Sequence, residues 1–214
     1  MNRNLTEIVF ILDMSGSMEP LAADTIGGFN SLLAKQKRQK GRAVVTTLLF
    51  NDKSHVIHDR QDIRQVGPLT PRDYCPSGCT ALLDAAGSAI RHIETVHRYA
   101  RPYDVPGHTL FVITTDGMEN ASTRYSLREV RHMIETAKER HWEFLFLGAN
   151  IDTEETARSM GIGRDRCVQY RPDAEGTTLN FAVLGETLCQ VREGLPLSGD
   201  WSAQIKEDLQ KRGR

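Results

Sequence analysis

Three short polar segments carry oxygen-bearing side chains at spacings that suit a metal site. They are residues 13–17, 77–82 and 115–117, which read Asp-Met-Ser-Gly-Ser, Ser-Gly-Cys-Thr-Ala-Leu and Thr-Asp-Gly. Each follows a predicted strand or precedes a predicted helix, where open α/β sheets place their ligand sites. The candidate ligands are two carboxylates and three hydroxyls: Asp13, Ser15, Ser17, Thr80 and Asp116. Such hard oxygen donors favour Mg²⁺, Ca²⁺ or Mn²⁺ over zinc or copper, and we expect Mg²⁺.

The elements that must position these side chains alternate between strands and helices. Short, nearly continuous apolar runs predict strands buried on both faces, at residues 8–12, 42–50, 54–58, 109–115, 143–149 and 167–170. Helical spacing of apolar residues predicts a helix after residue 17, three more that begin near residues 80, 126 and 152, and a last one that includes residues 181–191. Residues 67–79, rich in Pro, Gly, Asp and Ser, are expected to form a loop. The alternation predicts an α/β three-layer sandwich.

Two helix starts have recognisable caps. Ser126 and Glu129 have the spacing of a capping box, in which each side chain satisfies a free amide of the first turn. Asp152 is expected to cap the helix that follows the strand at 143–149. The histidines show no ligand spacing, so His92 and His97 are expected on the surface or in core packing.

The polar segments resemble a known motif. Asp-x-Ser-x-Ser after the first strand, Gly-x-Thr-x-Leu before a helix and Asp-Gly after the fourth strand look like the metal-ion-dependent adhesion site (MIDAS) of von Willebrand factor A domains. The similarity in motif order spans residues 5–192. It implies a Rossmann-like, mostly parallel six-stranded sheet with one antiparallel edge strand. Without an export signal, the chain is most similar to stand-alone, bacterial-type intracellular members.

The resemblance also implies roles for the five residues. Ser15, Ser17 and Thr80 are expected to coordinate the metal through their hydroxyls. Asp13 and Asp116 are expected to lie close by, often through water, and to orient the ligands. A cation held by neutral donors attracts an outside anion, so an Asp or Glu of an unidentified partner protein is expected to complete the coordination. This mechanism binds a partner without catalysis, and we do not expect an enzyme.

Other interpretations remain open from the sequence. A metal-assisted hydrolase would need a general base, for which Glu119 is the only fair candidate. Alternatively, the chain is a regulatory subunit of an ATPase- or kinase-associated complex whose last helix moves when the metal engages a carboxylate. Glu119 and Asn120 are expected in a solvated loop or at a partner contact. Cys75 and Cys79 are half of a zinc site at most and are expected to be structural or incidental.

Composition narrows the class of protein. The net charge is −1, so neither nucleic acid nor a membrane surface is an expected partner. The apolar runs are too short for a signal peptide or a membrane span, and four cysteines suit a reducing cytosol, so we expect a cytoplasmic protein. With no linker between two cores, we expect one domain over residues 1–214, with a core at about 5–192 and a helical tail at 193–214.

Overall fold

A six-stranded sheet forms the centre of the computed structural model, which describes residues 1–213. The strand order is β3-β2-β1-β4-β5-β6. Neighbouring strands pair in parallel except β2 and β3, which pair antiparallel at one edge. The strands are β1 Asn2–Asp13, β2 Arg42–Phe50, β3 Ser54–Asp62, β4 Pro106–Thr115, β5 Trp142–Gly148 and β6 Cys167–Gln169. The predicted fold class is confirmed, including the antiparallel edge strand.

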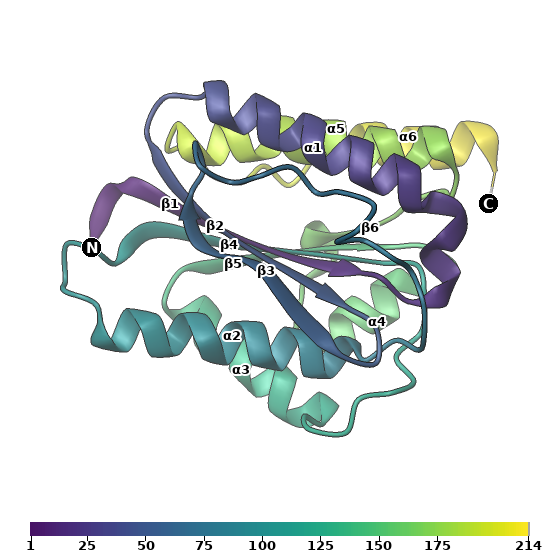
Figure 1. The fold of residues 1–214 in the computed structure, drawn as a ribbon, viewed down its shortest axis with the longest axis horizontal. Helices are drawn as coiled ribbons and strands as arrows, with labels where there is room; N and C mark the ends of the chain where they lie inside the picture. The colour runs from purple at the N-terminus through teal and green to yellow at the C-terminus, as the bar shows by residue number, and fades with distance from the viewer. Residues whose placement is uncertain (214) are drawn as a thin grey trace.

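Helices cover both faces of the sheet (Figure 1). Helices α1, α5 and α6 lie on one face, and α2, α3 and α4 lie on the other. The helices are α1 Ala22–Arg38, α2 Leu82–Tyr99, α3 Leu127–Glu139, α4 Thr153–Ser159, α5 Ala174–Arg192 and α6 Ala203–Arg212. Two short 3-10 helices, η1 Gly16–Leu21 and η2 Arg164–Arg166, lie in the connections.

The predicted elements agree with these bounds, with shifts at some ends. Strand β1 begins at Asn2 rather than residue 8, because the Asn2 amide donates to the Val105 carbonyl (2.7 Å) and the pairing with β4 extends outward. Strand β4 likewise begins at Pro106, before the predicted start at residue 109. The capping box at Ser126 and the cap at Asp152 are confirmed, since both side chains accept the predicted amide bonds.

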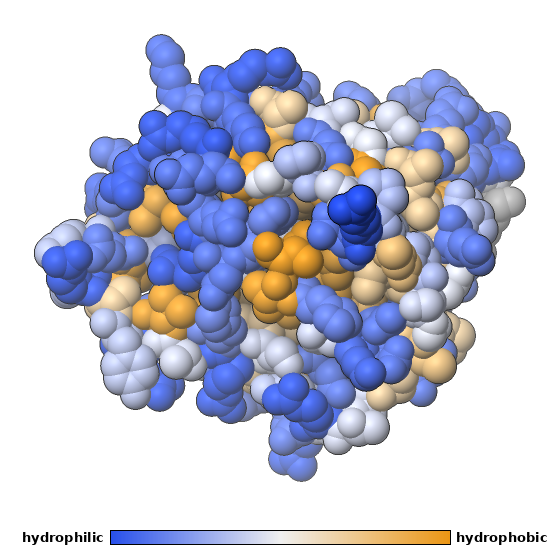
Figure 2. All heavy atoms as spheres, viewed as in Figure 1, coloured by the Kyte–Doolittle hydropathy of each residue, from blue (hydrophilic) through white to orange (hydrophobic). Residues whose placement is uncertain are grey.

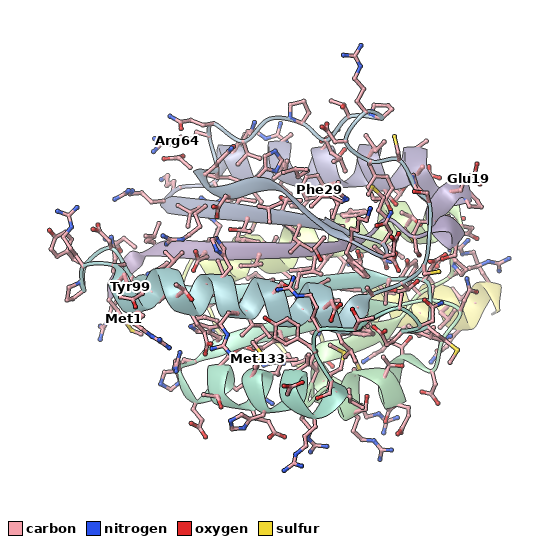
Figure 3. All side chains as sticks on the ribbon, turned by 60° about the horizontal axis from the view of Figure 1, so that its bottom comes forward. Met1, Glu19, Phe29, Arg64, Tyr99 and Met133 are labelled. Carbon is pink, nitrogen blue, oxygen red and sulfur yellow. The ribbon has the colours of Figure 1, made fainter. Side chains whose placement is uncertain are left out.

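The core is divided by the sheet into two layers. Alternate residues of β1 point to opposite faces: Ile8, Phe10 and Leu12 face α1 and α5, whereas Val9 and Ile11 face α2 and α3. The first layer is built around aromatic contacts, such as the edge-to-face contact of Phe10 with Phe29, whose ring centroids lie 5.1 Å apart. Figure 3 shows Phe29 between α1 and the sheet. Burial on both faces explains the continuous apolar run at residues 8–12 of this strand.

One charged group, Glu7, lies in β1 directly before the apolar run at residues 8–12. Glu7 is fully buried in β1, with Oε1 2.5 Å from Arg60 Nε of β3 and Oε2 2.5 Å from His97 Nε2 of α2. Arg60 adopts a positive φ of 46°, next to the register shift between β2 and β3. His97 packs edge-to-face on Trp142 at 5.2 Å. The buried carboxylate is therefore matched by two basic side chains from neighbouring elements.

Strand β3 forms an exposed edge. Figure 2 shows hydrophilic residues over most of the face in front, with separate hydrophobic patches near its middle. Val56 of β3 is 52% exposed, while His55, Asp59 and Asp62 supply polar groups along the same strand. Hydrogen bonding to the Arg64 guanidinium lowers the pKa of Asp62 to about 2. Charged residues of this kind disfavour edge-to-edge pairing with other chains.

The tail contains the predicted helix, α6. Trp201 and Ile205 are buried, and Trp201 Nε1 donates to the Asp165 carbonyl at 3.0 Å, which fixes the start of α6. Among residues 1–213, none of the helices combines the length and apolar character needed to span a bilayer. The cytoplasmic location and the division into a core and a tail stay predictions.

Candidate metal site

The end of β1 places Asp13 at the centre of the site. Its side chain is fully buried, and Oδ1 accepts the Ser15 amide at 2.7 Å while Oδ2 accepts the Thr115 hydroxyl at 2.5 Å. The Tyr74 hydroxyl donates to the Asp13 carbonyl, also at 2.5 Å. Thr115 is the last residue of β4, which pairs with β1, so the register of the sheet brings the two residues together.

Hydroxyl groups lie beside this carboxylate. The chain turns from β1 into η1, and Ser15 Oγ lies 3.1 Å from Ser17 Oγ. The Ser17 hydroxyl donates to Asp116 Oδ1 at 2.5 Å, which joins the loop after β1 to the loop after β4. Ser15 and Asp116 are buried, whereas Ser17 is exposed. The site therefore opens to solvent on the Ser17 side, at the end of the sheet that Glu19 marks in Figure 3.

Gly117 shows where the hydroxyls converge. A Cβ atom at this position would lie 2.8 Å from Thr80 Oγ1, 3.4 Å from Ser17 Oγ and 3.8 Å from Ser15 Oγ. Three hydroxyl oxygens from two loops thus surround one point that only a glycine leaves free. The structure brings all five predicted residues together at the carboxyl ends of β1 and β4.

The loop after β4 also fixes Thr80 and the start of α2. The Thr80 amide donates to Asn120 Oδ1 (2.9 Å), and the Leu83 amide donates to Glu119 Oε2 (2.9 Å). Glu119 also accepts the amides of Ala121 and Ser122 and the Ser122 hydroxyl. Glu119 is therefore a structural carboxylate with four donors, which holds the Asp116 loop against the first turn of α2.

Burial dominates the electrostatics of the site. Burial raises the pKa of Asp13, opposed by its hydrogen bonds with Thr115 and Ser15, and the charge of Asp116 raises it further. Burial also raises the pKa of Asp116, opposed by the Ser17 hydroxyl. Tyr170 is also buried near both carboxylates. Its pKa is raised mainly by burial and further by the charges of Asp116 and Asp13. Neither carboxyl group forms an ion pair within residues 1–213, so the site holds two buried acids without a basic partner.

Several contributors were not predicted from the sequence. Thr115 and Tyr74 orient Asp13, and Asn120 positions Thr80. Thr115 could have been found from its place at the end of β4, beside the end of β1. Tyr74, in the loop before α2, gave no signal in the sequence. Cys75 and Cys79 are exposed free thiols of that same loop.

The donor set fits a hard divalent cation. Within residues 1–213, no three His, Cys, Asp or Glu side chains gather as a metal-binding group, so the candidate site depends on hydroxyls as well as carboxylates. Ser17 donates its proton to Asp116 and keeps its oxygen lone pairs available. Ligands at right angles around Mg²⁺ lie about 3 Å apart, given Mg–O distances near 2.1 Å, and the 3.1 Å between the Ser15 and Ser17 hydroxyls matches that separation.

Comparison with solved structures identifies the fold. A von Willebrand factor type A structure from Catenulispora acidiphila has a TM-score of 0.56 and 15% identity, covering 87% of this chain and 42% of that one. The fold is that of a von Willebrand factor type A (vWA) domain. Proximal thread matrix protein 1 from the mussel byssus, in the structure with a zinc occupied MIDAS motif, has a TM-score of 0.59 and 12% identity, covering 88% of this chain and 46% of that one. Manganese-loaded TRAP protein of Plasmodium vivax has a TM-score of 0.56 and 16% identity, and the match covers 84% of this chain and 72% of that one.

These similarities extend over the fold and not over whole proteins. The chain spans about half the length of the mussel protein structures that it matches. No family model matches the sequence, and no curated protein matches it. At identities of 12–16% the likeness establishes the vWA fold, and the function rests on the residues of the site.

Proposed function

We propose that this vWA domain is a metal-dependent protein-interaction module. In this proposal Ser15, Ser17 and Thr80 hold a divalent cation, Mg²⁺ first and Ca²⁺ or Mn²⁺ as alternatives, while Asp13 and Asp116 orient the hydroxyls. When bound, the cation supplies an electrophilic position that an outside carboxylate can occupy. The partner is a protein that presents an Asp or Glu at its surface.

The observation that carries the proposal is a pair of buried carboxylates without a cation. Asp13 is 0% exposed and Asp116 is 4% exposed, and the donors to their side chains are hydroxyls and an amide. Burying uncompensated charges is costly, and buried charges are normally paired or coordinate metals. A divalent cation at the adjacent hydroxyls would balance both charges.

The exposed side of the site supports an interaction role. Ser17 is exposed, and Met118, next to Gly117, is 71% exposed. An exposed methionine beside a polar centre provides an adaptable apolar contact for a partner. Two of the similar structures hold metals by their own descriptions: zinc in a MIDAS motif and manganese in TRAP.

We propose no catalytic role for the site. The hydrolase alternative requires a general base near the metal, and Glu119 was the candidate. Its two oxygens accept four hydrogen bonds that hold the loop and the start of α2, so this carboxylate has a structural task. The regulatory movement of the last core helix, the cytoplasmic location and the stand-alone bacterial-type assignment also stay predictions.

Titration of the purified chain with Mg²⁺ tests metal binding. We expect Mg²⁺ to raise the melting temperature of the wild type, with about 2.7 kcal/mol of stabilisation at a concentration 100 times the dissociation constant. Asp116→Asn should lose this response, whereas Asp104→Asn, an exposed acid far from the site, should keep it. An equal response in both variants would refute the metal site.

Water relaxation with Mn²⁺ in place of Mg²⁺ tests the open coordination position. Water bound to Mn²⁺ at the site should enhance proton relaxation, and a peptide that contains one glutamate should reduce this enhancement by displacing that water. The same peptide with glutamine in place of glutamate is the control. Equal effects of the two peptides would contradict recognition of a carboxylate while leaving metal binding intact.

A further inference from the structure

The opposite end of the sheet carries a hollow lined by basic side chains. Its volume is about 890 Å³, and it lies where β1 and β4 begin and where α1 and α5 end. This end is near the N-terminus in Figure 1 and near Met1 and Tyr99 in Figure 3. Its charged lining residues are Arg3, Arg38, Lys40, Arg192 and Glu193. We call it the amino-end hollow.

The cations of the amino-end hollow lack carboxylate partners. Arg3, Arg38, Lys40 and Arg192 form no ion pair with residues 1–213, and unlike the other unpaired cations they line one hollow together. Glu193 is the single acid of the lining, against four cations. In a chain of net charge −1, this is a local excess of positive charge.

Arg192 gives the amino-end hollow a fixed cation. Its Nη1 donates to the Gln36 carbonyl at 2.6 Å, and Nη2 donates to the Gly41 carbonyl at 3.1 Å. Its Nε is buried and has no hydrogen-bond partner among the described residues. Burial lowers the pKa of this guanidinium, which shows that its charge is partly desolvated. The side chain therefore holds the end of α1 through carbonyl oxygens, and its charge is opposed by that of Asp62 without an ion pair.

Arg3 is brought to the same place by the sheet. A Cβ at Gly107 would lie 2.8 Å from the Arg3 Cα, so a glycine is needed for β4 to begin against the main chain of Arg3. Cations at helix ends commonly balance the free carbonyls of the last turn, as Arg192 does for α1. Arg3 comes from a strand, and its charge adds to the hollow independently of those carbonyls.

We propose that the amino-end hollow binds a small molecule that carries two or more phosphate groups. Guanidinium and ammonium groups donate to phosphate oxygens, and the hollow presents the exposed Arg3, Arg38 and Lys40. Both Nη atoms of Arg192 already donate to protein oxygens, so this residue adds its positive charge to the wall of the hollow. Its volume falls in the range of small-molecule sites, about 300–1,000 Å³. The lining contains no Phe, Tyr or Trp, and His108 is its one ring, so the charged groups of the ligand and not a stacked ring are the main recognised groups.

Calorimetric titration with tripolyphosphate tests this proposal. The titration is done in chelator and repeated in Asp116→Asn, so that its outcome is independent of the metal site. We expect the wild type and Asp116→Asn to bind equally, and more tightly than they bind sulfate at matched ionic strength. Arg38→Gln combined with Lys40→Gln removes two exposed cations and should weaken binding about tenfold or more.

A matched pair of substitutions provides the control. Arg91→Gln combined with Arg128→Gln removes two exposed arginines from α2 and α3, which do not line the hollow, and should bind tripolyphosphate like the wild type. Equal weakening in the two double variants would show a general charge effect and overturn the proposal. So would the absence of measurable binding, or capture by vesicles containing phosphatidylinositol bisphosphate without binding of free tripolyphosphate.

Discussion

Strand β1 carries two fully buried carboxylates, Glu7 and Asp13, in different surroundings. Glu7 lies in the middle of the sheet and contacts Arg60 and His97, so its charge is matched within the chain. Asp13 lies at the end of the strand beside Asp116, and both receive only hydroxyl and amide donors. The first arrangement is a closed structural pair, and the second leaves negative charge for a cation from outside. The same strand thus shows how structural and ligand-binding acids differ in their partners rather than in their burial.

Removal of the closed pair should have the largest effect on stability. We expect Glu7→Gln to lower the free energy of unfolding by about 3–5 kcal/mol, because it leaves Arg60 without its carboxylate in a largely buried position. Urea denaturation in chelator measures this change. A loss of unfolding free energy below about 1 kcal/mol would show that the contacts of Glu7 contribute little. It would contradict the distinction between Glu7 as a structural acid and Asp13 as an acid of the metal site.

The same change from carboxylate to amide at the candidate metal site should not lower the stability of the fold in this way. In chelator, Asp116→Asn should unfold within about 1 kcal/mol of the wild type, or above it, since the amide oxygen can still accept the Ser17 hydroxyl and one buried charge is gone. The measurement is again urea denaturation, compared with Glu7→Gln. A loss as large as that of Glu7→Gln would mean that Asp116 is a structural acid.

Filling the space between the hydroxyls should separate the metal from its ligands. Gly117→Ala retains all five candidate ligands but places a methyl group 2.8 Å from Thr80 Oγ1. Crowding of this kind costs about 1–3 kcal/mol, so Mg²⁺ affinity should fall roughly tenfold. Calorimetry with Mg²⁺ measures the change, and Gly67→Ala, at a position with open space, is the control. Unchanged affinity in Gly117→Ala would place the cation elsewhere.

An exposed pair completes the series with the smallest effect. Asp62→Asn should cost about 0.2–1 kcal/mol at pH 7, since the Asp62–Arg64 pair lies in water. Because the pKa of Asp62 is lowered from 3.8 to about 2, its contribution is present above pH 3.8 and is lost as the pH falls toward 2. Urea denaturation of both proteins between pH 7 and pH 3 should show the difference shrinking below pH 4. A difference in unfolding free energy that stays constant down to pH 3 would show that it does not come from the charge of Asp62.

The sequence predicted the candidate site better than it predicted the buried ion pair. Asp13, Ser15 and Asp116 lie directly after apolar strands, and parallel strands end at one edge of a sheet, so their proximity follows from local patterns. Glu7 is one charge in a run that otherwise signals a buried strand. Its partners come from 53 and 90 residues away, through a bulge and a helix face, and no local pattern contains that pairing.

The caps of α3 and α2 also differ in how far along the chain their partners lie. The capping box of α3 is complete within four residues, so it was predictable from Ser126 and Glu129. The cap of α2 comes from Glu119 and Asn120, which lie 36 and 40 residues along the chain from the amides they satisfy. Only the tertiary structure reveals this cap, because its residues are ordinary loop residues in the sequence.

The cap of α2, whose acceptors come from the loop after β4, has a consequence for the order of folding. The amides of Thr80, Leu83 and Asp84 find side-chain acceptors only in Asn120, Glu119 and Ser122, so this cap cannot form before the loop after β4 is in place. We expect this cap, and Thr80 with it, to be among the late events of folding, since closing the long loop between them precedes any gain from these bonds. A chain that ends before residue 119 would contain all five candidate ligands but would lack the side chains that hold Thr80 and the start of α2.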